Sequence, residues 1–171
     1  RENIQERQGQ KRENIQNRLQ DGLAFLDGMT DPQTGVTGYV QRGGRHAREA
    51  GAEAGWPAAE SESMTAVALL CRIFADPNLE RSGALEAVER AADIVAALPP
   101  VWDDAQPGRR DYYFWYYGTT ALFQVGGPRW QQWQAGLTHA IAEQQRPDGD
   151  AHGSWDPQHD PWGGQGGRVY A

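Results

Sequence analysis

The sequence lacks several features that would assign it to a particular class of protein. Its single cysteine, Cys71, excludes a disulfide within the chain. No apolar run approaches the roughly twenty residues that a membrane-spanning helix needs. No basic patch offsets the net charge of −7, so a nucleic-acid partner is not expected. We therefore expect a soluble chain without a membrane span, in which Cys71 is a small buried hydrophobe inside the apolar run 66–74.

A strand pattern is missing as well. No segment alternates apolar and polar residues, whereas several segments place apolar residues three or four positions apart. The sequence therefore predicts an all-α fold. Its 171 residues, 39% of them hydrophobic, suffice for one domain with a core. We expect this domain to span 1–171, with a lead-in at 1–11 that frays and a long glycine-rich loop at 28–60.

The expected helices follow a repeated pattern. Pro77 and Pro128 end two apolar helices at positions 51 residues apart, and a Thr-Ala pair precedes each of them. An amphipathic helix follows each proline, and a loop follows that helix. A period near 50 residues indicates a repeat of helix pairs that cover one another. The helices that we expect span residues 15–28, 61–75, 82–98, 111–125 and 129–146, with another beginning at 168.

The most aromatic segment is the string of six rings at 112–117. It covers every side of a helix, so we expect that helix to be buried on all sides. Two interpretations stay open. The rings form a packed core, as aromatic stripes more often do, or they line a cavity for an apolar or cationic guest. The residues that would line such a cavity are Tyr112, Trp115, Tyr116 and Thr119.

Asp103 and Asp104 are the only two carboxylates adjacent in the sequence. An acid catalyst needs a carboxyl that burial or a like-charged neighbour keeps protonated. The cations Arg109 and Arg110 follow closely and favour the ionised form of both carboxyls. We therefore interpret the pair as part of a solvated turn, with acid catalysis as the weaker alternative.

The loop at 148–160 collects four carboxylates and two imidazoles, which together can hold a divalent metal. Its spacing matches no recognised ligand pattern, and its Asp-Gly and Asp-Pro pairs are ordinary turn formers. We expect no bound metal and no other cofactor, and we expect chelation to leave the melting temperature unchanged. The candidate ligands are His152, Asp156, His159 and Asp160.

Two short segments resemble a known superfamily. Residues 141–145 end in glutamines, and a Gly-Ser-Trp segment follows at 153–155. This resembles the repeat of the α/α-toroid proteins, which include squalene–hopene cyclases and protein prenyltransferase β subunits. In that repeat a glutamine bonds exposed backbone at a helix end, and an indole ring stacks on it. The residues that carry the resemblance are Gln144, Gln145, Gly153 and Trp155.

The resemblance covers most of residues 61–171 and is strongest to bacterial cyclase-like repeat proteins of unassigned activity. It implies paired antiparallel helices in an arc of about half a ring, joined by long glycine-rich loops. It also implies an apolar small-molecule ligand, or a protein partner or second copy at the open repeat ends. An exported, periplasmic location is compatible with it.

The catalytic features of the superfamily are missing. The chain has no Asp-x-Asp-Asp cluster like that of the cyclases, and no loop cysteine to match the zinc ligand of the prenyltransferases. We therefore expect a non-catalytic binding or scaffold module. The alternative is an enzyme of the terpenoid cyclase or prenyltransferase type that acts on an isoprenoid-like substrate.

Overall fold

The computed structural model describes residues 4–44, 55–57, 59, 61–103, 105 and 110–171. Over these residues the protein has six α-helices and packed helix pairs, and its only strand-like feature is the isolated bridge between Thr30 and Thr37. The all-α prediction is confirmed. The elements are α1 (Ile4–Met29), α2 (Ser63–Ala75), α3 (Ala84–Ala96), α4 (Tyr112–Val125), α5 (Gly127–Ile141), the short 3-10 turn η3 (Ala142–Gln144) and α6 (Gly163–Tyr170).

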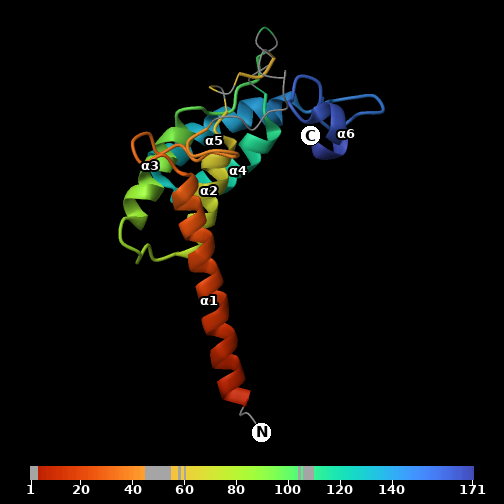
Figure 1. Ribbon diagram of the computed structural model, residues 1–171. Coiled ribbons are helices and arrows are strands. Elements are labelled where there is room, and N and C mark those ends of the chain that lie inside the picture. Colours follow the sequence, from red (N-terminus) through yellow and green to blue (C-terminus); the bar gives the residue numbers. More distant parts are fainter. Residues whose placement is uncertain (1–3, 45–54, 58, 60, 104, 106–109) are drawn as a thin grey trace.

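Helices α2 to α5 form the packed body of the protein (Figure 1). α2 and α4 lie against each other in one layer. α3 packs against both of them, and α5 packs against α4 and α3, so α3 and α5 make a second layer. α1 touches the body near its C-terminal end and extends away from it, while α6 lies on the other side near the C-terminus.

The core lies between the two layers and is built on aromatic rings. Phe114 and Trp133 are fully buried, and their rings meet edge to face with centroids 5.5 Å apart. Gly118 makes this packing possible, since a Cβ atom there would lie 2.5 Å from the Trp133 ring. The Trp133 indole donates a hydrogen bond of 2.9 Å to Thr119 Oγ1, so its polar atom is satisfied.

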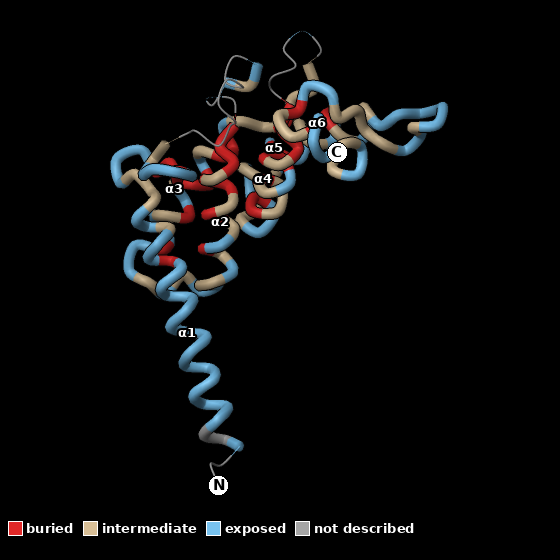
Figure 2. The backbone as a smooth tube through the Cα atoms, turned by 45° about the vertical axis from the view of Figure 1, so that its right-hand side comes forward, coloured by how far each residue is buried: buried red, intermediate tan, exposed pale blue. Residues whose placement is uncertain are grey.

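α1 differs from the other helices because most of it is exposed (Figure 2). Only near its end does it bury a large side chain, Leu23, against the body. Ile15 and Leu19 remain 52% and 39% exposed. The helix begins at Ile4, so the lead-in that we expected to fray is helical from that residue.

Two expectations about burial are wrong. Tyr116 and Phe123 of α4 are 67% and 62% exposed, although we expected this helix to be covered on all sides. Cys71 of α2 is also exposed. The reason is that the second layer covers α2 and α4 from one side, which leaves a stripe of each helix uncovered.

The glycine-rich segments are more ordered than we expected. α6 begins at Gly163, earlier than the start that we expected at 168, and Gly167 kinks it with a φ of 61°. In the long loop, Asp31 accepts amide hydrogen bonds from Gln33 and Thr34 and so forms a tight turn. Much of that loop, at 45–54, 58 and 60, lies outside the described residues.

Candidate functional site

Three buried carboxylates lie at or shortly before the starts of three helices. Glu62 precedes α2, Asp111 precedes α4 and Asp160 precedes α6, and they are spaced 49 residues apart. Their exposed fractions are 4%, 2% and 3%. Acidic residues are rarely buried to this extent unless their environment satisfies them. We call these three residues the acid row.

Asp111 joins the start of α2 to the start of α4. Its Oδ1 accepts a hydrogen bond of 2.8 Å from the Phe114 amide and so caps α4. Its Oδ2 accepts a hydrogen bond of 2.7 Å from the Ser61 hydroxyl and a longer one from Ser63. The starts of α2 and α4 therefore lie side by side at the same end of their layer.

Asp160 joins α4 to α6 in a similar way. Its Oδ2 accepts from the Tyr112 amide at 2.7 Å, and its Oδ1 accepts from the Trp162 amide at 2.8 Å. The Tyr112 hydroxyl in turn donates to the Asp156 carbonyl oxygen at 2.9 Å. Through these bonds, the loop before α6 is fixed against the first turn of α4.

The environment of Asp160 changes its chemistry. Burial raises its pKa to about 6, and the nearby charge of Asp111 acts in the same direction. The amide hydrogen bonds of Tyr112 and Trp162 favour the ionised form and offset only part of this. Burial and the charge of Asp160 also raise the pKa values of Tyr112 and Tyr170. A carboxyl with a pKa near neutrality can hold or deliver a proton.

The carboxyl whose pKa is raised among these candidates is Asp160, and the adjacent pair that we singled out lies elsewhere. Asp103 accepts a hydrogen bond of 2.8 Å from the Ala105 amide, as a turn-forming aspartate does. Asp104 lies outside the described residues. The signal that reveals the acid row is the recurrence of an acidic residue every 49 positions, shortly before α2, α4 and α6.

A stripe of uncharged side chains lies beside the acid row. α4 contains no charged residue, and the one charged residue of α2, Arg72, is buried. Both helices pack against α3, so the stripes that they leave uncovered face away from the second layer. We call this surface the uncharged face. It consists of Val67, Cys71 and Phe74 of α2, and Tyr113 and Tyr116 of α4. Phe123 is not part of it, because its ring packs edge to face on Trp130 of α5 with centroids 5.3 Å apart.

The four residues proposed to line a cavity lie in different surroundings. Tyr112 and Trp115 are buried in the core, where their rings meet edge to face at 5.4 Å. Thr119 is partly buried and accepts the Trp133 indole. Tyr116 lies on the uncharged face and packs edge to face on Tyr117 at 5.2 Å. Of the four, only Tyr116 is on a surface that a ligand reaches directly.

The four candidate metal ligands are not brought together as a metal site. His152 and His159 are exposed. Asp156 accepts from the Gln158 amide at 3.0 Å, and both oxygens of Asp160 are engaged by amides. Among the described residues, no group of three or more His, Cys, Asp or Glu side chains could hold a metal ion.

The glutamine and tryptophan of the proposed repeat meet at the end of α5. Gln145 Nε2 donates to the Gly153 carbonyl oxygen at 2.8 Å. The Trp155 indole donates to the Ile141 carbonyl oxygen at 2.7 Å, and its ring packs against the core. These bonds hold the loop at 146–154 against the helix end, whereas Gln144 lies in the turn η3 without a role in them. The loop leads directly to Asp160.

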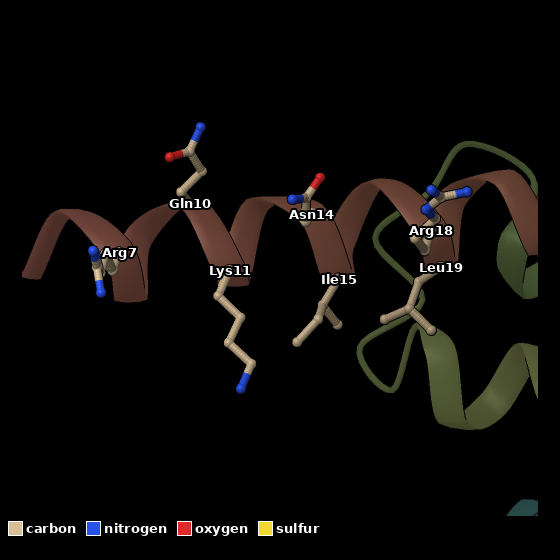
Figure 3. Close-up of a pocket in the computed structure, with 7 residues that line it drawn as sticks. All are labelled: Arg7, Gln10, Lys11, Asn14, Ile15, Arg18 and Leu19. Carbon is tan, nitrogen blue, oxygen red and sulfur yellow. The ribbon is translucent and has the colours of Figure 1, made fainter. Parts of the chain in front are cut away.

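The long exposed helix α1 carries a shallow hollow of about 620 Å³ (Figure 3). All the residues that line it belong to this one helix, so it is the open flank of a helix. It mixes basic, amide and apolar side chains and has no opposite wall. The lining residues are Arg7, Gln10, Lys11, Asn14, Ile15, Arg18 and Leu19.

None of the helices in the described part of the chain combines the length and the apolar character that crossing a membrane requires. Comparison of the chain with protein-family models, with curated proteins and with solved structures gave no match.

Proposed function

We propose that the chain is a non-catalytic helical-repeat module that binds an apolar molecule, or an apolar surface of a protein partner, through the uncharged face. The observation that carries the proposal is the exposure of aromatic rings where no charge accompanies them. Phe74 and Tyr116 of this face are 61% and 67% exposed. An aromatic side chain buries roughly 150–250 Å² when covered. Covering both of them is a strong driving force for binding.

We also infer that the helix pairs form an arc of an α/α toroid, about half a ring. Two features support this. α2 and α4 start at the same end of one layer, with α3 and α5 behind them. The acid row repeats with a constant spacing of 49 residues, as expected when each repeat adds one helix to each layer. In such an arc the uncharged face would be the concave inner face.

A binding experiment with matched variants tests the proposed function. The probe is a long-chain isoprenoid alcohol, and binding is measured by equilibrium dialysis. Tyr116→Lys places a charge on the uncharged face and should weaken binding at least about tenfold. Leu85→Lys is the matched control, since Leu85 is similarly exposed at 56% but lies on α3. Equal effects of the two substitutions, or no binding by the unmodified chain, would remove the support for this function.

A second candidate function is acid catalysis on an isoprenoid-like substrate. It is favoured by Asp160, a buried carboxyl with a pKa of about 6 that accepts from the Tyr112 amide at the start of α4. Incubation of the protein with squalene and with prenyl diphosphates, followed by product analysis, distinguishes the two functions. The binding module forms no product. A product that disappears on Asp160→Asn, while the variant stays folded, would establish the enzyme instead.

The open ends of the arc make self-association a related expectation. Sedimentation over a range of concentrations would detect it, and the Tyr116→Lys variant would show whether the uncharged face or an end of the arc forms the contact.

A further inference from the structure

We propose that residues 156–170, which comprise α6 and the loop before it, form a lid that opens away from the first turn of α4 and uncovers the ring of Tyr112. The lid lies beside the packed body at the C-terminal side of the protein (Figure 1). In the closed arrangement Tyr112 is only 6% exposed. The motion belongs to the protein without a ligand, so the inference does not depend on the proposed function.

The bonds that close the lid converge on Tyr112. The Tyr112 amide donates to Asp160 Oδ2 at 2.7 Å, and the Tyr112 hydroxyl donates to the Asp156 carbonyl oxygen at 2.9 Å. The Tyr170 ring of α6 meets the Tyr112 ring edge to face, with centroids 6.3 Å apart. Because these three connections share one residue of α4, they form and break together.

The other side of the lid has a fixed point at Trp155. The Trp155 indole bonds the Ile141 carbonyl oxygen at the end of α5, and Arg168 of α6 donates to the Trp155 carbonyl oxygen at 2.8 Å. A further bond joins the lid to the long loop, since the Trp56 indole donates to the His159 carbonyl oxygen at 2.8 Å. The lid therefore has a pivot at Trp155 and a detachable edge at Tyr112.

The closed arrangement is weakly held. Four of the eight residues of α6 are glycine, which favours a helix less than any residue except proline. The Tyr170 hydroxyl is buried close to the Asp160 carboxyl, yet it makes no hydrogen bond of regular geometry with a described residue. A buried hydroxyl without a partner is costly, and opening lets water bond to it. Opening of the lid should therefore require much less free energy than unfolding of the body.

Opening extends the uncharged face. Tyr112 lies four residues before Tyr116, so the two side chains are neighbours on α4. Tyr116 is already 67% exposed. An open lid presents the Tyr112 ring beside it, with Trp115 in edge-to-face contact behind at 5.4 Å.

Asp160 makes the opening depend on pH. Burial raises the pKa of this carboxyl to about 6 in the closed lid, whereas its ordinary value is 3.8. The closed lid therefore binds the proton more tightly, and the open fraction should rise between about pH 4 and pH 6 and then level off. The ionisable groups around Asp160 and its partner Tyr112 are Asp111 and Arg110 before α4, Asp156 in the loop, and Arg168 and Tyr170 in α6.

Amide hydrogen exchange of the full chain, followed by NMR without a ligand, measures the opening. The Tyr112 amide bonds to Asp160 across the edge of the lid, whereas the Phe114 amide bonds to Asp111 within the same helix start. Relative to its rate in an unfolded chain, the Tyr112 amide should exchange at least about tenfold faster than the Phe114 amide. Between pH 4 and pH 7 its protection should fall by up to about a hundredfold.

Substitutions in α6 locate the effect. Tyr170→Ala removes the ring that covers Tyr112 and should speed exchange of the Tyr112 amide at least about tenfold. Tyr170→Phe keeps the ring and removes the buried hydroxyl, so exchange should be no faster than in the unmodified chain. Val169→Ala is the matched control, because Val169 is fully exposed on the same helix. It should leave the exchange unchanged.

Three results would overturn the lid. The first is a Tyr112 amide as protected as the Phe114 amide at pH 7. The second is Tyr170→Ala behaving like Val169→Ala, or Tyr170→Phe speeding exchange as much as Tyr170→Ala. The third is a protection of the Tyr112 amide that does not fall between pH 4 and pH 7.

Discussion

At the start of α2 the chain gathers carboxylates, whereas at its end it pairs carboxylates with arginines. The acid row brings Asp111 and Asp160 together in the interior, and their hydrogen-bond partners are mainly amides and hydroxyls. At the other end, Asp27 lies between Arg72 and Arg81 at 3.1 and 2.8 Å. Each arrangement holds helices together, but the first raises the pKa of Asp160, whereas the second lowers the pKa of Asp27.

Opposite causes produce this difference. For Asp160, burial is the largest influence on the pKa and raises it to about 6. For Asp27, partial burial alone would raise the pKa, but the hydrogen bonds and charges of Arg81 and Arg72 outweigh burial and lower it. Burial therefore dominates the pKa of Asp160, whereas at Asp27 the two arginines together outweigh burial. Ionisation of Asp160 at the start of α2 should therefore lower the stability of the fold, whereas ionisation of Asp27 at the end of α2 should raise it.

The largest expected effect concerns the loop that carries Asp160 to α4. Trp155 anchors this loop through its bond to the Ile141 carbonyl oxygen and its packing on the core. Trp155→Ala should lower the free energy of unfolding by about 3 kcal/mol, because both contributions are lost. It should also weaken any pH dependence due to Asp160. Chemical denaturation at pH 5 and pH 7 measures both effects.

Trp162→Ala is the control for that substitution. Only the backbone amide of Trp162 bonds to Asp160, and alanine retains it. The loss should be below about 1 kcal/mol, as for most partly exposed positions. If both tryptophans prove equally important, the loop is not anchored by Trp155.

The next effect is the pH dependence of stability. The pKa of Asp160 is about 6 in the folded chain, above the ordinary value of 3.8. The folded state therefore binds the proton more tightly, and stability should fall as the pH rises from about 4 to 6 and then level off. The fall is at most about 3 kcal/mol. In Asp160→Asn this slope should disappear, and denaturation across that pH range provides the measurement.

The smallest expected effect on stability comes from the ion pairs at the end of α2. Asp27→Asn removes the charge that pairs with Arg72 and Arg81. Its side chain is 47% exposed, so solvent screens the pairs and the cost should be only about 1 kcal/mol. The folded pKa lies below 3.8, so this contribution is present above pH 4 and lost in stronger acid. A loss as large as that of Trp155→Ala would show that the arginine network is a main source of stability.

The periodic apolar residues were sufficient to predict the helices. They placed α2 to α5 within a few residues, because spacing and proline breaks act locally. The exposure of Tyr116 could not be predicted from its neighbours. It depends on which side of α4 the second layer covers, and that is a property of the packed helices.

The acid row was harder to recognise for a related reason. We looked for a perturbed carboxyl at Asp103 and Asp104, which are adjacent in the sequence. The structure instead brings together Asp111 and Asp160, which are far apart along the chain. The pairing of Asp27 with Arg72 and Arg81 was missed because the three residues come from separate parts of the chain. Local patterns predict elements, whereas sites assembled from several elements require the fold.

A titration of the carboxyl carbons by NMR tests the contrast between the two ends of α2 most directly. Followed from pH 2 to pH 8, Asp160 should titrate near pH 6, while Asp27 should titrate below its ordinary value of 3.8. Titration of Asp160 at or below 3.8 would contradict the account, because burial would then not disfavour the ionised form of this carboxyl. Titration of Asp27 above 3.8 would contradict the role assigned to its two arginines.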